Sequence, residues 1–101
     1  MNNLQSPALS SIINILEQVM EKITDDSDIV WTRFNTPKEM RQEIASYLES
    51  LKKGDLGCLN NISLLFAPTG AFQEHSISNG WSEAYVQMAV FFDQALAAIS
   101  R

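Results

Sequence analysis

The stretch "TPKEMRQEIASYLESLKKG", from Thr36 to Gly54, decides the fold because it carries the signals of a complete α-helix. Thr36, Pro37 and Glu39 match a capping box with proline at the first helical position, where the missing N–H removes no hydrogen bond. Two lysines and Gly54 close the stretch, as expected at the negative end of a helix dipole. The predicted buried face comprises Met40, Ile44, Tyr47, Leu48 and Leu51.

A second helix is predicted before this stretch. It begins at Ser6 and Pro7, again an N-cap followed by proline at the first helical position. The segment "TDDSD", residues 24–28, ends it. Its apolar residues recur at steps of three and four and form one stripe: Leu9, Ile12, Ile13, Leu16, Val19, Met20 and Ile23.

The segment between these two helices, "IVWTRFN" over residues 29–35, is β-branched and aromatic. No partner strand is evident, and a lone strand leaves its backbone hydrogen bonds unmade. We therefore expect an extended connector in which Trp31 and Phe34 cover the core.

After Gly54 we expect two further helices. Asp55 is the predicted cap of a third helix, "DLGCLNNISLLF" over residues 55–66, which Pro68 and Gly70 stop. Residues 71–76 are expected to make a short helical turn. The last helix runs from Trp81 or Ser82 to Ile99.

Together these elements predict one all-α domain over residues 1–101. We expect a compact, bundle-like array of four main helices with a long ordered connector, residues 66–81, before the C-terminal helix. The second and third helices are expected to form a tight αα-hairpin through Gly54 and Asp55.

The last helix has a second apolar strip beside its main stripe. The residues of this strip are Val86, Val90, Phe91 and Ala97. A helix that is apolar on two sides is either central in its domain or faces another subunit, and exposed apolar patches usually mark interfaces. The strip therefore predicts a homodimer or a protein partner.

Composition narrows the class of function. The chain is 46% hydrophobic and 19% charged, with a net charge of −5 and a pI near 4.6. This charge repels phosphate backbones and anionic lipid, so we expect neither nucleic-acid nor membrane binding. One cysteine allows no intrachain disulfide and fits a reducing compartment. The N-terminal residues match neither a signal peptide nor a membrane span, so the cytoplasm is the expected location.

No catalytic, cofactor or metal site is predicted. Cys58 and His75 are the only thiol and imidazole, and their spacing neither supports nor excludes a nucleophilic pair. Glu74 and His75 are adjacent and would point about 100° apart on a helix, so they would not chelate a metal together. The acidic residues 25–28 lack the glycine and the glutamate of a calcium loop. Nucleotide-binding and hydrolase motifs are also missing from the sequence.

The stretch "LFAPTGAFQEHSISNGW", residues 65–81, gathers unusual residues. Pro68, Thr69 and Gly70 are typical of a turn, and Asn79 with Gly80 is typical of a helix C-terminal cap. Phe72, Ile77 and Trp81 would anchor the loop to the core. The remaining polar residues predict a loop recognition surface, since binding surfaces are commonly built on rigid loops; they are Gln73, Glu74, His75 and Asn79.

Residues 65–93 resemble a segment of small uncharacterised bacterial proteins, notably of cyanobacterial type. In these a similar Phe-Ala-Pro-Thr-Gly, Gln-Glu and Asn-Gly-Trp run precedes a final amphipathic helix. The resemblance extends toward Trp31 and implies a bacterial source, but it implies no activity, ligand or site residue.

Two functions are therefore predicted. The first is a non-enzymatic interaction or regulatory protein that forms a homodimer through its C-terminal helix. The alternative is a small-molecule or metal-binding protein with its site in the 68–81 connector.

Overall fold

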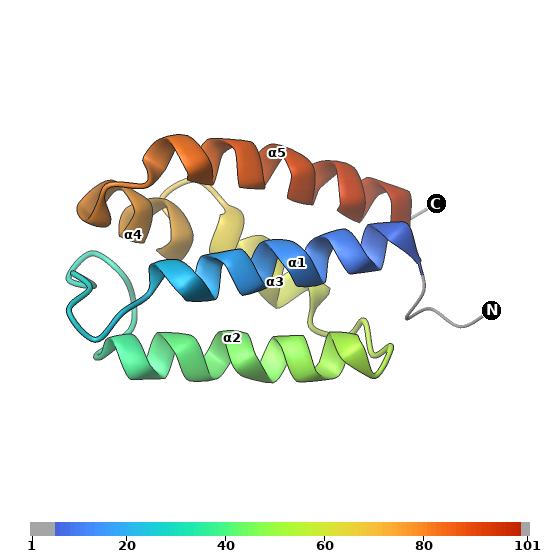
Figure 1. Cartoon of the computed structure of the whole chain (residues 1–101), viewed down its shortest axis with the longest axis horizontal. Helices are drawn as coiled ribbons and strands as arrows, with labels where there is room; N and C mark the ends of the chain where they lie inside the picture. The colour runs from blue at the N-terminus through green and yellow to red at the C-terminus, as the bar shows by residue number, and fades with distance from the viewer. Residues whose placement is uncertain (1–5, 100–101) are drawn as a thin grey trace.

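The computed structural model describes residues 6–99, and this part of the chain folds into five α-helices. The three long helices, α1 (Pro7–Lys22), α2 (Pro37–Lys52) and α5 (Ser82–Ile99), lie side by side with α1 between the other two (Figure 1). The two short helices, α3 (Leu59–Phe66) and α4 (Ala71–Asn79), lie behind them. The all-α prediction is confirmed, whereas the number of four helices is wrong. Within residues 6–99, none of the helices has the length and apolarity that crossing a membrane requires.

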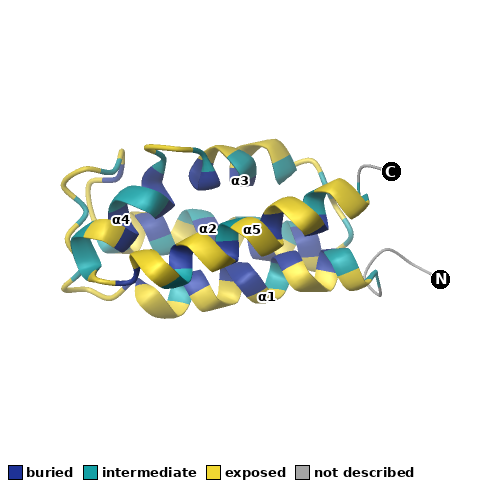
Figure 2. Cartoon of the chain, turned by 90° about the horizontal axis from the view of Figure 1, so that it is seen from above, coloured by how far each residue is buried: buried dark blue, intermediate teal, exposed yellow. Residues whose placement is uncertain are grey.

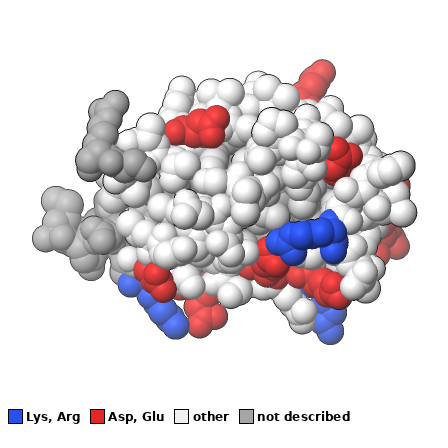
Figure 3. Space-filling view, turned by 180° about the vertical axis from the view of Figure 1, so that it is seen from behind, with Lys and Arg blue, Asp and Glu red and all other residues white. Residues whose placement is uncertain are grey.

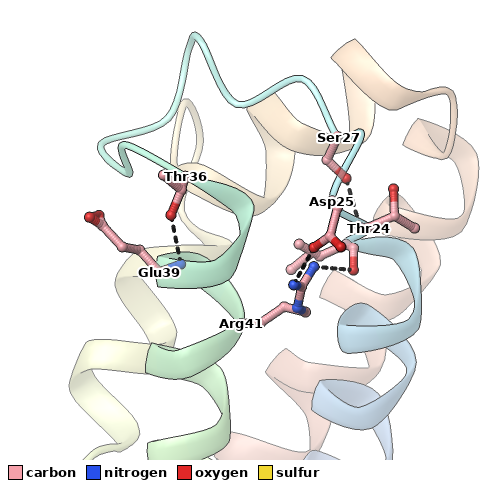
Figure 4. Close-up of polar contacts among 7 residues, drawn as sticks. Thr24, Asp25, Ser27, Thr36, Glu39 and Arg41 are labelled. Atoms are coloured by element: carbon pink, nitrogen blue, oxygen red, sulfur yellow. Dashed lines mark hydrogen bonds and ion pairs between the residues drawn. The ribbon is translucent and has the colours of Figure 1, made fainter.

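The predicted starts of the first two helices are confirmed by their capping bonds. Ser6 accepts the backbone N–H of Leu9 at 3.4 Å, and Thr36 accepts that of Glu39 at 3.1 Å (Figure 4). The Glu39 carboxylate accepts the N–H of Asn35 at 3.3 Å, one residue earlier than a standard capping box. Gly54 ends α2 with a φ of 83°, which favours glycine.

The third helix begins four residues later than expected, at Leu59. The Asp55 side chain accepts the N–H of Gly57 at 2.9 Å and so forms a local turn instead of a helix cap. The prediction that Asp55 caps this helix is therefore wrong.

The predicted connector before the last helix is largely a helix of its own, α4. Gly70 precedes it, and Gly80, with a φ of 82°, ends it. Two of its four buried residues, His75 and Ser76, are polar. A buried face of this composition gives no hydrophobic periodicity, which is why the sequence indicated only a short turn.

The core is one apolar cluster between the helices (Figure 2). Phe66 at the end of α3 contacts several of its aromatic residues, with its ring centroid 4.5 Å from that of Phe92 and 4.9 Å from that of Phe72. Tyr85 stacks on Phe66 and donates its hydroxyl to the Phe66 carbonyl at 2.8 Å. Ile15, outside the predicted stripe of α1, is also buried, because α1 packs against both α2 and α5.

The segment between α1 and α2 contains the two residues that were predicted to cover the core, and only one of them is buried. Phe34 is buried, but Trp31 is 72% exposed, so the expectation that Trp31 covers the core is wrong. The backbone and hydroxyl of Thr32 both donate to the Ile29 carbonyl, and the resulting tight turn carries Trp31 at its tip.

Polar bonds hold the start of this segment against α2. The Arg41 guanidinium pairs with Asp25 at 2.6 Å and donates to the Ile23 carbonyl at 3.2 Å, as Figure 4 shows. The Ser27 hydroxyl accepts the Thr24 N–H at 2.9 Å. The acidic residues 25–28 therefore make a helix-end turn.

Candidate interaction surfaces

The four residues of the predicted loop recognition surface belong to α4, and three of them form hydrogen bonds through their side chains within the chain. Gln73 accepts the Thr69 N–H at 2.5 Å. The Asn79 amide both accepts the backbone N–H and donates to the backbone carbonyl of Asp28, each at 2.8 Å. Glu74 is half-buried, and His75 is completely buried. The prediction that His75 is exposed on a recognition surface is therefore wrong.

His75 instead pairs with Trp81 inside the protein. The Trp81 indole N–H donates to Nδ1 of His75 at 2.9 Å. Among residues 6–99, Nε2 of His75 is the one fully buried side-chain nitrogen or oxygen atom without a hydrogen-bond partner. Burial lowers the pKa of His75, and the nearby Asp28 carboxylate opposes this effect. The imidazole is therefore held neutral.

Cys58 and His75 do not form a nucleophilic pair in this structure. The Cys58 thiol lies 3.9 Å from the Tyr47 carbonyl, while His75 bonds to Trp81. Burial raises the pKa of the Cys58 thiol, whereas a reactive cysteine needs a lowered one. No three His, Cys, Asp or Glu side chains within the described span lie close enough together to hold a metal ion.

A groove of about 610 Å³ runs between α1 and α5. Phe91, 57% exposed, borders it, and small side chains such as Ser11, Ala84 and Ala98 leave it open. The amides of Asn14, Gln18, Gln87 and Gln94 also line it. None of its thirteen lining residues is charged, although 19% of the chain is. The sequence had indicated the α5 side of this groove through Phe91, but not the α1 side.

The four predicted interface residues lie on two different sides of α5. Val86, Val90 and Ala97 are four and seven residues apart and share one side, while Phe91 is turned about 100° from Val90. Phe91 faces the α1–α5 groove, and none of the other three lines it. Val86 and Val90 are 59% and 48% exposed within one chain.

A second groove, of about 490 Å³, lies between the segment before α2, α3 and the start of α4. Trp31 and Leu64, 72% and 71% exposed, border it together with Tyr47. Thr69 lines its other end with a φ of 62°, a conformation that is rare for a β-branched residue.

The frame around this second groove is fixed by polar bonds. Arg33 pairs with Glu43, and Tyr47 donates its hydroxyl to the same carboxylate at 2.8 Å. Desolvation raises the pKa of Glu43, but the bonds from Arg33 and Tyr47 outweigh it, and the net shift is downward. Glu43 therefore stays ionised at neutral pH.

Charge is unevenly distributed over the molecule. Residues 56–99 carry three charged side chains, Glu74, Glu83 and Asp93, while residues 6–55 carry the other fifteen of this span. Figure 3 shows the same division, with most coloured atoms along the side of α2 and the segment before it. Since interface centres are depleted in charge, this distribution favours the α5 side of the molecule as a contact surface.

Comparisons of this chain with protein families, with curated proteins and with solved structures gave no match. The resemblance to cyanobacterial-type proteins stays a prediction.

Proposed function

We propose that this protein is a non-enzymatic interaction protein that pairs with a second copy of itself through the α1–α5 groove. The uncharged lining of the groove carries the proposal. Two copies with a net charge of −5 repel each other, and like charges brought together across an interface are costly. A face without charged residues allows the closest approach at the lowest electrostatic cost.

The shape of the groove supports a second copy as its occupant. A two-fold interface uses the same patch on both partners, so the patch must contain both a protruding group and a hollow that receives it. Phe91 is the protruding group, and the small residues Ser11, Ala84 and Ala98 border the hollow. Aromatic side chains that fill such hollows commonly dominate binding energy.

The size of the face predicts a weak dimer. A face as long as α1 and two helices wide covers about 24 by 20 Å, or roughly 500 Å² per partner. The total of about 1,000 Å² is at the lower limit for specific interfaces. We therefore expect a dimer that dissociates on dilution into the low micromolar range, and whose affinity rises with salt as the repulsion is screened.

Two neighbouring substitutions on α5 test the proposal. Phe91→Glu places a charge in the groove, and Val90→Glu places the same charge on the other exposed side of the helix. Sedimentation equilibrium from 1 to 200 μM should show a monomer for Phe91→Glu and a wild-type dimer for Val90→Glu. Circular dichroism serves as the control that both variants fold.

Three results would contradict the proposal. A wild-type chain that remains monomeric at 200 μM excludes self-association in this range. A dimer that survives Phe91→Glu but not Val90→Glu moves the contact to the side of Val86, Val90 and Ala97. Equal loss in both folded variants would mean that the charge acts nonspecifically.

The alternative function, small-molecule binding at the 68–81 connector, is supported by one observation. Thr69, Gly70 and Ala71 of the connector line the second groove opposite Trp31. A bound ligand must raise the melting temperature by mass action, so thermal-shift screening with Trp31→Ala as control tests this function. The single cysteine supports a reducing compartment such as the cytoplasm for either function.

A further inference from the structure

The hydrogen bond between His75 and Trp81 fixes the proton on the imidazole. An indole nitrogen can only donate, so Nδ1 of His75 must accept and cannot carry a proton. The ring is therefore the neutral tautomer with its proton on Nε2. This bond requires the uncharged ring. In the imidazolium Nδ1 would carry a proton, and two N–H donors would face each other.

The same residue lies in a chain of bonds that joins three segments. Trp81, directly before α5, binds the His75 ring, and the His75 carbonyl accepts the Asn79 amide at 2.9 Å. Asn79 in turn bonds to both backbone groups of Asp28 at 2.8 Å. The start of α5, the C-terminal half of α4 and the segment between α1 and α2 are thus connected through one short network at one end of the molecule.

We propose that His75 is an acid-sensitive latch: a proton taken up at Nδ1 breaks the bond to Trp81 and releases α4 together with the segment around Asp28. The step moves only a proton, from solvent to the Nδ1 lone pair that had accepted the indole N–H. The released state keeps α1 packed on α2 and on α5, since these two contacts do not involve α4. Proteins can open locally without unfolding as a whole, and protonation of histidine is one event that can trigger such a change.

The groups around the ring set the direction of the pH effect. Asp28, from the segment before α2, is the charged group near the ring within residues 6–99, and its carboxylate favours the protonated ring and so raises the pKa of His75. On α5, the titratable neighbour is Tyr85, which lies beyond Trp81 and donates its hydroxyl to Phe66. Burial outweighs Asp28, so the pKa of His75 in the closed state lies below its usual range.

In the open state the ring is solvated and titrates near 6.5. Opening therefore becomes more favourable as the pH falls below about 6.5, by at most tenfold per pH unit for one proton. The increase stops once the pH passes the lowered pKa of the closed state.

The chain contains a single histidine, so its imidazole can be followed without substitution. Nitrogen-15 NMR at pH 7.5 should show the Nε2–H tautomer, and the titration midpoint should lie below 6.5. Native-state hydrogen exchange from pH 7.5 to 5.5, corrected for intrinsic rates, should show protection falling in α4 and near Asp28. Protection in α1 and α2 should change less.

Two variants separate the latch from a general effect of acid. His75→Asn keeps an oxygen acceptor near the position of Nδ1 but does not titrate, so its exchange pattern should no longer depend on pH in this window. Asp28→Asn leaves the backbone groups used by Asn79 in place and should retain the pH dependence.

The proposal is overturned if the ring carries its proton on Nδ1, or if it titrates at or above 6.5. It is also overturned if His75→Asn shows the wild-type pH dependence, because carboxylates would then be responsible. If His75→Asn fails to fold, the NMR titration of the wild-type ring still tests the proposal.

Discussion

Substitution of Gly70 by alanine should strongly lower the free energy of unfolding, because the added methyl group has no space. An added Cβ would lie 2.6 Å from the Leu64 carbonyl oxygen, 2.8 Å from that of Ala67 and 3.0 Å from that of Leu65. All three are backbone atoms at the end of α3, so the clash cannot be relieved by the rotation of a side chain. The Gly70 N–H also donates to the Ala67 carbonyl at 2.8 Å, which holds the turn closed. Gly70→Ala must therefore move the backbone between α3 and α4.

The expected cost of Gly70→Ala is about 3 kcal/mol, at the upper end for overpacking because the obstacle is backbone. For a domain of this size that corresponds to a fall in melting temperature of roughly 12–24 °C. Gly80→Ala is the matched control: its φ of 82° is strained for alanine, but no atom lies within 4 Å of the added Cβ. Its cost should be about 1–2 kcal/mol.

Urea denaturation of the two variants measures this difference, provided that the m-values stay equal to that of the wild type. The reasoning is refuted if Gly70→Ala costs no more than Gly80→Ala. Such a result would mean that the turn shifts freely and does not fix the position of α4.

Two further substitutions test local strain and capping by the same measurement. Thr69→Gly removes the conformational penalty of a threonine at a φ of 62°, so the free energy of unfolding should stay equal or rise by up to about 1 kcal/mol, although glycine usually destabilises. A loss above about 1 kcal/mol would contradict the inference that Thr69 is strained. Thr36→Ala removes the cap of α2 and should cost about 1 kcal/mol. Thr24→Ala, at a position that caps no helix, should stay within about 0.5 kcal/mol, and an equal cost in both would exclude capping as the cause.

Local signals in the sequence predicted helix boundaries well where a side chain bonds its own backbone. Ser6 and Thr36 cap the helices that they were expected to cap, and Gly54 and Gly80 adopt the positive φ expected of them. These features depend on a few neighbouring residues, so the sequence alone contains the necessary information.

Burial was harder to predict because it depends on contacts between distant residues. His75 was expected at the surface on account of its polarity, yet Trp81 satisfies one ring nitrogen inside the core. Trp31 was expected inside, yet a turn places it in solvent. Phe91 and Val90 were assigned to one surface, although adjacent residues of a helix point about 100° apart; the position of α1 shows which of the two borders the groove.

The packing of α1 on the last helix has a consequence for synthesis on the ribosome. α1 and α2 leave the exit tunnel before α5, the helix that covers the other side of α1. Until then the apolar residues of α1 that face α5, including Ile15, lack their cover. The nascent chain thus exposes an apolar face of α1 until residues 82–99 have left the tunnel, and only then can the contact between α1 and α5 form.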